Sequence, residues 1–475
     1  MKRFKLSLVI FTVILSIVLL AGCGQTATTY PAHVEGSLFG GKSDDSIAVD
    51  VTFDSKWITK SDNTKYNPEL AAFAALCCAD SYFRLKDYEK GTQNRVLFDD
   101  EEESAYDFTS FFKKMGFTEV KHVESFSEKE YTSDTNDSVT MTMAYRNVDS
   151  KYDMYVVALR GCFSSAEWLS IFDPGCDNAI YTELTGEHPE WTNKNHFKGL
   201  DIAANRADEF LKEFMEANDD PKSKDCILFT GHSRGGSLAN ILGAKYEKEG
   251  QARTYTYSFN TAGTTCSEDA GEYKTVFNIF DTNDFFTDPL PLGEEKFVRY
   301  GINVTEPISD NAEVLKALAD LKGRDDYISV DPAIKEQYQE LFGAAYPNRT
   351  SLYEEKSFTE TFATREDAEA RAEELQNLIG KENGLGAEAF CSIGQIKETS
   401  EGKFELTTKY NGGAVLIGFS KLLSYGPSVY EPLVNLFLQD AQVCEIATLL
   451  SENLAGISGG HLIVNSYVLG QNVRK

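Results

Sequence analysis

Cations, cysteines and cofactor motifs are all scarce in this sequence. Lys and Arg number 46 against 74 Asp and Glu, a formal net charge of −28, so the chain repels phosphate backbones and is not expected to bind nucleic acid. Nine cysteines in 475 residues are too few for a disulfide scaffold. HExxH, paired CxxC, P-loop and GxGxxG patterns are missing, so no motif supports a metal or nucleotide enzyme, and we expect no cofactor and no metal.

The overall composition is that of an ordinary globular protein. Hydrophobic residues make up 42% of the chain and charged residues 25%, which argues against a disordered or fibrous chain. The length allows one large elaborated domain or two to three ordinary ones.

Residues 1–22 have the pattern of a lipoprotein signal peptide. Three cations precede an apolar run over residues 6–21, which is too short to span a membrane comfortably. The run ends in Leu-Ala-Gly-Cys, which resembles a bacterial lipobox and would leave Cys23 as the lipid-anchor residue; the alternative is an ordinary signal peptide with an incidental cysteine. We expect an extracytoplasmic protein, lipid-anchored to the bacterial cell membrane through Cys23.

A globular core is predicted after a tether. Residues 23–66 are rich in Gly, Ser, Thr, Asp and Lys, which predicts a flexible spacer running into one or two strands. Asn67-Pro68 begins a helical pattern of apolar residues. Strands and helices then alternate through the predicted core, residues 67–305. We expect strands at 141–145, 154–159, 226–230, 254–259, 276–280 and 297–300, and helices at 197–215 and 237–248. This order predicts an α/β fold, a mostly parallel central sheet with helices on both faces.

Ser233 is the candidate nucleophile. It lies in a GxSxG pattern, Gly231-His232-Ser233-Arg234-Gly235, between the apolar run CILFT and a helix of small residues. Strand, sharp turn and helix in that order form a nucleophile elbow, which lifts the serine clear of the sheet. The second GxSxG, around Ser458, follows a helical stretch instead, so we interpret it as a flexible loop.

Six histidines are available as the base that a serine nucleophile needs. Four are set aside: His33 in the tether, His232 inside the elbow, and His122 and His188 in polar, surface-like stretches. Of the remaining two, His196 and His461, only His461 follows the serine, as the α/β-hydrolase chain order requires. It comes directly after two glycines and before a strand-like apolar run.

The acid that orients the base is expected just past the strand predicted at 276–280. Asp281, Asp284 and Asp288 are all candidates, and each is alternatively a turn-forming aspartate. We choose Asp284.

These motifs together resemble the class 3 lipases of the α/β-hydrolase superfamily. GHSRGGSLA resembles the family's GHSLGGALA, and VVALRGC with Trp168 resembles its VVAFRGT...W strand before the oxyanion loop. NDFFTDPLPL resembles NxxDxVPxLP and places the acid at Asp284, while HLIVNSY resembles the late segment that carries the family's histidine, placing the base at His461. His196, in a stretch similar to the family's HxGF, would be structural.

The resemblance covers residues 67–305 and the final stretch, and it implies hydrolysis of carboxylic esters of the acyl-glycerol type. The backbone N–H groups of Cys162 and Arg234 would form the oxyanion hole. Cys162 stands where the family has Thr or Ser, and Arg234 replaces Leu or Gln. The Arg234 cation could favour an ionised nucleophile or an anionic substrate; we expect it to pair with a nearby carboxylate.

Residues 306–455 are a large insertion relative to the family, and residues 456–475 would complete the core with the catalytic histidine. Helices are expected at 311–321, 332–341, 365–378, 414–423 and 429–454. The insertion is therefore interpreted as a helical cap over the site, or as a helical subdomain with its own core. Phospholipid or wall-polymer esters, or an inactive surface-binding lipoprotein, are the alternative functions.

Overall fold

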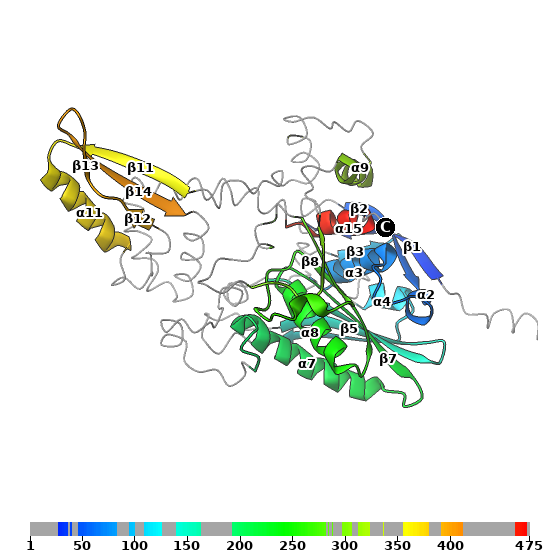
Figure 1. Cartoon of the computed structure of the whole chain (residues 1–475). Helices are drawn as coiled ribbons and strands as arrows, with labels where there is room; N and C mark the ends of the chain where they lie inside the picture. Colours follow the sequence, from blue (N-terminus) through cyan, green and yellow to red (C-terminus); the bar gives the residue numbers. More distant parts are fainter. Residues whose placement is uncertain are drawn as a thin grey trace, which may run out of the picture.

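A computed structural model describes most of the predicted core and parts of the insertion (Figure 1). It describes residues 27–36, 39, 46–82, 95–99, 109–125, 139–162, 192–281, 284, 287, 297–305, 312–323, 336, 355–379, 391–411 and 461–472. Residues 1–22, the proposed anchor Cys23 and His188 lie outside this set. No helix among the described residues is both long and apolar enough to cross a membrane.

The central sheet has seven strands in the order β10-β9-β8-β7-β6-β5-β4. Their bounds are β4 (Glu119–Ser125), β5 (Val139–Val148), β6 (Tyr152–Leu159), β7 (Lys224–His232), β8 (Arg253–Phe259), β9 (Val276–Phe280) and β10 (Ile302–Thr305). Strands β6 to β10 are parallel to one another. β5 pairs with β6 in the antiparallel direction, and the edge strand β4 pairs with β5 in the same way. The expected mostly parallel α/β sheet is confirmed, and it is consistent with the α/β-hydrolase fold.

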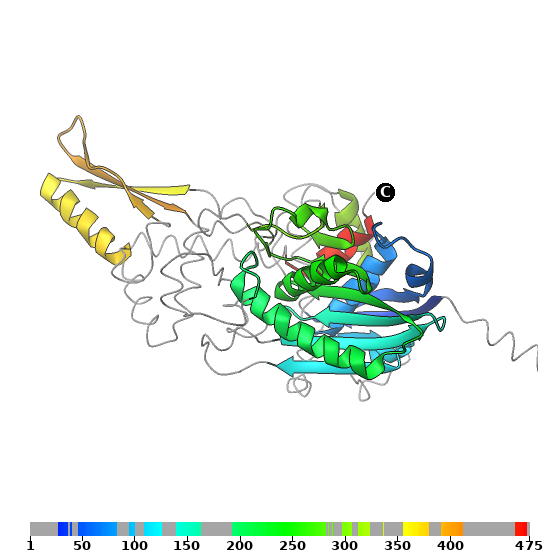
Figure 2. The ribbon, with the colours of Figure 1, turned by 60° about the horizontal axis from the view of Figure 1, so that its bottom comes forward.

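Helices cover both faces of this sheet, as the sequence predicts (Figure 2). α7 (Lys198–Asn218) and α8 (Arg234–Glu249) pack on one face, and α3 (Pro68–Asp80) and α15 (Ile463–Asn472) pack on the other. Strand side chains alternate between the two cores: on β6, Val156 is buried with α3 and Val157 with α7 and α8. Because successive side chains of a strand point to opposite faces of the sheet, each buried strand contributes to both hydrophobic cores.

α3 begins where the sequence predicts. Asn67 is its N-cap, and the side-chain oxygen accepts hydrogen bonds from the N–H groups of Glu69 (3.0 Å) and Leu70 (3.2 Å). Pro68 occupies the first turn, where a helix needs no N–H from that residue. Nearly the whole helix is buried, because a second sheet covers the side that faces away from the central sheet.

That second sheet corrects the tether prediction. β1 (Ala27–Glu35), β2 (Ser46–Asp54) and β3 (Arg95–Phe98) form an antiparallel sheet in the order β2-β1-β3. It is flanked by two short helices, α2 (Lys56–Thr59) and α4 (Ser110–Lys114). Phe53 of β2 is buried against Phe73 of α3 with ring centroids 5.5 Å apart. The one or two strands expected at the end of the spacer are confirmed, but a flexible tether over residues 23–66 is wrong for β1 and β2. Alternate side chains of these strands are apolar and are buried in the core that contains α3, so both strands belong to the folded part of the chain.

The insertion was expected to be helical, but it also contains a sheet. α9 (Ala312–Leu321) and α11 (Arg365–Ile379) confirm two of the predicted helices. Between and after them lie four strands, β11 (Glu355–Phe362), β12 (Cys391–Ile393), β13 (Lys397–Glu398) and β14 (Phe404–Asn411), which form a sheet that α11 covers. Leu375 of α11 and Leu406 of β14 are its buried centre. The segments 414–423 and 429–454, and nearly all of 332–341, lie outside the described residues.

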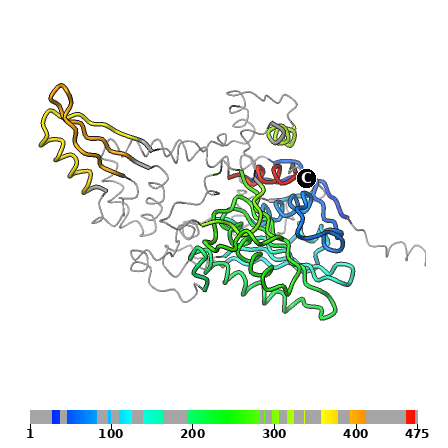
Figure 3. The backbone as a smooth tube through the Cα atoms, viewed as in Figure 1, coloured from blue at the N-terminus to red at the C-terminus, as the bar shows by residue number. Residues whose placement is uncertain are grey.

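Two further predictions of strands are wrong. The strand expected at 297–300 is instead an isolated bridge between Val298 and Thr265, and the parallel strand β10 follows at Ile302–Thr305. The apolar run after His461 is the helix α15, drawn in red in Figure 3. It packs on α3 and β9. Its β-branched residues favour a strand locally, but burial of a helical face against α3 decides the structure.

Candidate active site

Ser233 lies at the junction of β7 and α8 in a strained backbone conformation. Its φ of 58° and ψ of −127° lie in a region that non-glycine residues rarely adopt. Such a conformation costs on the order of 1–3 kcal/mol and persists only where the surroundings enforce it. The Ser233 N–H donates to the Phe259 carbonyl at 2.9 Å, which fixes the turn against the end of β8.

The flanking glycines explain why the turn can be so tight. A Cβ on Gly231 would lie 2.1 Å from the Gly235 carbonyl oxygen, and a Cβ on Gly235 would lie 2.1 Å from that of Leu159. Any side chain at either position would push α8 away from β6 or β7. The sequence pattern thus corresponds to the close helix and strand packing that an elbow requires.

His461 and Asp284 form a direct pair. His461 Nδ1 lies 2.7 Å from Asp284 Oδ2, and the Asp284 side chain is completely buried. Because a carboxylate only accepts, Nδ1 is the donor, and in the neutral ring Nε2 is then the basic nitrogen. This is the tautomer that a general base needs.

Of the three candidate acids, the structure brings Asp284 to the imidazole. Asp281 is also buried, and its carbonyl accepts a hydrogen bond of 2.9 Å from the Asp284 N–H, so it forms part of the turn that carries the acid. Thr287 closes that turn through a hydroxyl that donates to the Asp284 carbonyl at 2.6 Å. Asp288 lies outside the described residues.

His461 also lies against the elbow. Its ring centroid is 4.8 Å from that of His232, the residue before Ser233, and His232 Nε2 donates to the His461 carbonyl at 2.8 Å. The three predicted side chains come from positions 233, 284 and 461, and these contacts gather their segments at the carboxyl edge of the sheet. The pair therefore borders His232, the residue next to the candidate nucleophile Ser233.

Both predicted oxyanion residues adjoin Ser233. A Cβ on Gly161 would lie 3.0 Å from Ser233 Cβ, so the loop that continues into Cys162 passes directly beside the serine. Arg234 is the first residue of α8, and the first N–H groups of a helix have no acceptor within it. The Arg234 side chain is buried, and its expected pairing with a carboxylate stays a prediction.

With this geometry in place, comparison with known proteins identifies the segment around the elbow. Residues 156–289 match the family Lipase (class 3). This match confirms the resemblance to class 3 lipases over the segment from β6 through the acid turn, and it supports a carboxylic ester hydrolase. A search of curated proteins found no match.

Several solved lipase structures are similar to about half of the chain. Lip2 lipase from Yarrowia lipolytica has 14% identity and a TM-score of 0.30, with 50% of this chain and 78% of that chain covered. The triacylglyceride lipase of Rhizomucor miehei has 13% identity and a TM-score of 0.31, with 50% and 80% covered. The lipase of Rhizopus microsporus var. chinensis has 13% identity and a TM-score of 0.30, with 50% and 74% covered.

His196 has a structural role, as the lipase resemblance implies. Nδ1 lies 2.6 Å from Asp201 Oδ1, and Nε2 lies 2.8 Å from the Tyr300 hydroxyl. Burial raises the pKa of Asp201, but hydrogen bonds from His196 and from the Asn193 and Thr192 N–H groups outweigh burial and hold that pKa below its ordinary value. Both ring nitrogens thus join the start of α7 to neighbouring loops.

Two other histidines differ from their predicted settings. His122 belongs to β4, not to a surface stretch, and its largely buried ring lies 2.8 Å from the Thr142 hydroxyl. His33 belongs to β1 and not to a tether. β4 is the edge strand of the central sheet and β1 belongs to the other sheet, so neither histidine lies on the strands that lead into Ser233 or Asp284, and setting both aside as bases agrees with the structure.

Two residues that sequence reasoning missed support the site. Asn260, with φ of 49°, accepts a hydrogen bond from the Ser466 hydroxyl and donates its N–H to the Ile279 carbonyl at 3.0 Å. It thereby joins α15 to β9. Tyr82, two residues after the end of α3, lies beside His232. The only sequence signal for Tyr82 is a tyrosine shortly after a helix. Many tyrosines of a protein core have the same pattern, so this signal does not single it out.

The described residues contain one group of acidic side chains that could hold a cation. Asp153, Asp219 and Asp225 have carboxylate oxygens within 4.8 Å of one another. Asp153 and Asp225 lie near the amino ends of β6 and β7, whereas Ser233 follows the carboxyl end of β7. This group is therefore separate from the candidate active site.

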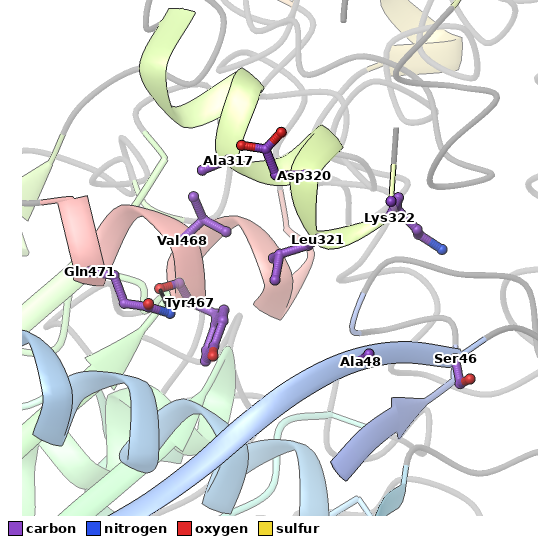
Figure 4. Close-up of a pocket in the computed structure, with 10 residues that line it drawn as sticks. Ser46, Ala48, Ala317, Asp320, Leu321, Lys322, Tyr467, Val468 and Gln471 are labelled. Carbon is purple, nitrogen blue, oxygen red and sulfur yellow. Dashed lines mark hydrogen bonds between the residues drawn. The ribbon is translucent and has the colours of Figure 1, made fainter. Parts of the chain in front are cut away.

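A hollow of about 670 Å³ lies on the outer side of α15 (Figure 4). It is bounded by α9, α15 and β2, with Leu321 and Val468 on facing helices. Its lining includes none of the residues predicted for catalysis.

Proposed function

We propose that this protein is a serine esterase that hydrolyses carboxylic esters of the acyl-glycerol type, with Ser233 as nucleophile, His461 as base and Asp284 as the orienting acid. The observation that carries the proposal is the 2.7 Å contact between His461 and Asp284, formed beside an elbow whose serine has a positive φ. The two residues are separated by 177 positions in the chain. The class 3 lipase match supports the substrate class.

In the proposed reaction, Ser233 Oγ attacks the ester carbonyl while His461 Nε2 takes the hydroxyl proton. Asp284 accepts from Nδ1 and stabilises the imidazolium that forms. The N–H groups of Cys162 and Arg234 donate to the tetrahedral oxyanion, where each donor is worth about 10²- to 10³-fold in rate. The alcohol leaves with the proton from His461, and water hydrolyses the acyl-enzyme by the same steps.

The nucleophile is tested by Ser233→Ala with nitrophenyl acyl esters. Loss of the attacking oxygen should lower kcat by up to about 10⁶-fold. Ser458→Ala is the matched control, since it removes the serine of the second GxSxG, and it should keep full activity. A Ser233→Ala enzyme as active as the wild type would refute the proposed nucleophile.

The substrate class is tested with a panel of esters on the purified protein. Acylglycerols should be cleaved faster than phospholipids or acetylated wall polymers of equal acyl concentration. Preference for phospholipid or wall-polymer esters would retain the mechanism and replace the substrate. No turnover of any ester would favour a binding protein instead.

We further propose that Cys23 carries a lipid that holds the enzyme outside the cytoplasmic membrane. The support is the apolar run followed by Leu-Ala-Gly-Cys. With Cys23→Ser, the full chain should lose incorporation of labelled palmitate and appear in the medium. Unchanged membrane retention and labelling would refute the anchor.

A further inference from the structure

A buried chain of hydrogen bonds connects the oxyanion loop to the residue of the base. The Gly161 N–H donates to Tyr82 Oη at 3.1 Å, Tyr82 Oη lies 2.7 Å from His232 Nδ1, and His232 Nε2 lies 2.8 Å from the His461 carbonyl oxygen. Tyr82 is 3% exposed and His232 is 1% exposed, so water does not compete for these groups. Three segments around Ser233 therefore share one polar network.

The proton positions in this chain follow from the partners. The His461 carbonyl can only accept, so His232 Nε2 carries a hydrogen. Burial, with the neighbouring His461 adding to it, holds the pKa of His232 well below its ordinary value, so the ring is neutral and has a single N–H. Nδ1 is then an acceptor, and the Tyr82 hydroxyl must donate to it.

Tyr82 suits the donor role. Burial raises the pKa of its hydroxyl well above the ordinary value, so the proton stays on the oxygen. The same oxygen accepts from the Gly161 N–H. All donors thus point the same way along the chain, from Gly161 through Tyr82 and His232 to His461, and aligned hydrogen bonds strengthen one another in a low dielectric.

The packing shows how closely the loop approaches this hydroxyl. A Cβ added to Gly161 would lie 2.1 Å from Tyr82 Oη and 2.8 Å from the His232 carbonyl oxygen. Only glycine fits there while the bond to Tyr82 exists. The hydroxyl therefore fixes how far the oxyanion loop lies from the elbow.

We propose that Tyr82 is a positioning residue for the esterase reaction: its hydroxyl holds the Gly161–Cys162 loop on one side and, through His232, the backbone of His461 on the other. The inference rests on the proposed function, because it concerns the placement of that function's base and oxyanion donors. Tyr82 itself touches neither the substrate nor the reacting atoms. Its contribution is to keep both partners of Ser233 in register.

The test is Tyr82→Phe, which keeps the ring and removes the hydroxyl. We expect kcat for nitrophenyl esters to fall by about 10- to 100-fold with KM nearly unchanged, since misplacement of catalytic groups by about 1 Å costs that much. Tyr66→Phe is the matched control. The Tyr66 hydroxyl donates to the Gly470 carbonyl of α15 at 2.7 Å but contacts neither Gly161 nor His232. It should lower Tm to a similar extent and leave kcat intact.

The tautomer of His232 gives a second, independent measurement on the unmutated enzyme. Nitrogen NMR at neutral pH should show a neutral His232 ring with the proton on Nε2. A ring protonated on Nδ1, or on both nitrogens, would overturn the proposed network even if Tyr82→Phe failed to fold.

The outcomes separate this proposal from the function on which it rests. Wild-type kcat in Tyr82→Phe, or a loss no larger than in Tyr66→Phe, would overturn the role of Tyr82 while an inactive Ser233→Ala upheld the esterase. An active Ser233→Ala would overturn both. An inactive Ser233→Ala, a selective kcat loss in Tyr82→Phe and the Nε2–H tautomer together would support both.

Discussion

Two close pairs of aspartate and histidine among the described residues have almost the same geometry and different surroundings. His196 lies 2.6 Å from Asp201, five positions along the chain, and His461 lies 2.7 Å from Asp284, which is 177 positions away. The second nitrogen of His196 lies against the Tyr300 hydroxyl, whereas the ring of His461 lies against His232 beside the elbow. A short contact between carboxylate and imidazole is therefore not a sign of catalysis by itself. In the proposed function, the strained serine next to His232 is what distinguishes the pair of His461 and Asp284.

The largest expected effect at either pair is that of Asp284→Asn. The amide cannot hold His461 in the required tautomer, so kcat should fall by about 10⁴-fold, with a much smaller change in Tm. Steady-state kinetics and thermal unfolding on the same preparation measure the two effects. A variant that keeps full activity would show that the pair at 284 and 461 is structural, like the pair at 196 and 201.

Asp201→Asn should have the opposite profile. The carboxylate accepts from His196 and from two backbone N–H groups, and hydrogen bonds to a charged group contribute about 1.5–3 kcal/mol each at most. We expect the free energy of unfolding to fall by about 1.5–3 kcal/mol in Asp201→Asn. The kcat of the folded fraction should be preserved.

The pH dependence of this variant follows from the lowered pKa of Asp201. A carboxylate with a folded pKa below its unfolded value of about 3.9 stabilises the protein above that pH. The stabilisation is lost as the pH falls through the lower folded pKa. Denaturant unfolding of wild type and Asp201→Asn should therefore converge in acid, and a constant difference down to that range would contradict the assignment.

Asp225 is a third case to set beside the two pairs, because it is a partly buried carboxylate whose neighbours are Asp153 and Asp219 and not an imidazole. Burial raises its pKa, and the charges of Asp219 and Asp153 raise it further. A carboxyl group with a raised folded pKa favours folding at low pH and disfavours it once ionised. Asp225→Asn should therefore raise the free energy of unfolding at neutral pH by less than about 1 kcal/mol, with a slightly higher Tm. This gain should vanish in acid, where the carboxyl group of the wild type is neutral. A loss of stability at neutral pH would instead indicate a bound cation between the three aspartates.

The sequence predicted the elements whose local pattern and final environment agree. β7 is a buried apolar run, and the first residue of α8, Arg234, is followed by small residues that pack on this strand, so both elements followed from the GxSxG context. The candidate base and acid came from chain order and from a strand followed by an aspartate-rich turn. The structure brings His461 and Asp284 together, although neither residue alone carries a distinctive local signal.

The elements that were missed depend on contacts distant in sequence. One or two strands were expected at the end of the spacer, but their packing on α3 was missed. β1 and β2 contain polar residues on one face and apolar ones on the other, and the apolar face has a role only because α3 offers it an apolar surface. α15 has the β-branched residues of a strand but folds as a helix against α3. Tyr82 was missed because its role is defined by His232, which lies 150 positions away.

The most direct measurement of the central claim is the site of reaction with a fluorophosphonate, located by mass spectrometry of the intact chain and its peptides. The account predicts a single adduct on Ser233, absent in Ser233→Ala and formed far more slowly in His461→Gln. An adduct on another serine such as Ser458, or equal labelling in His461→Gln, would contradict it.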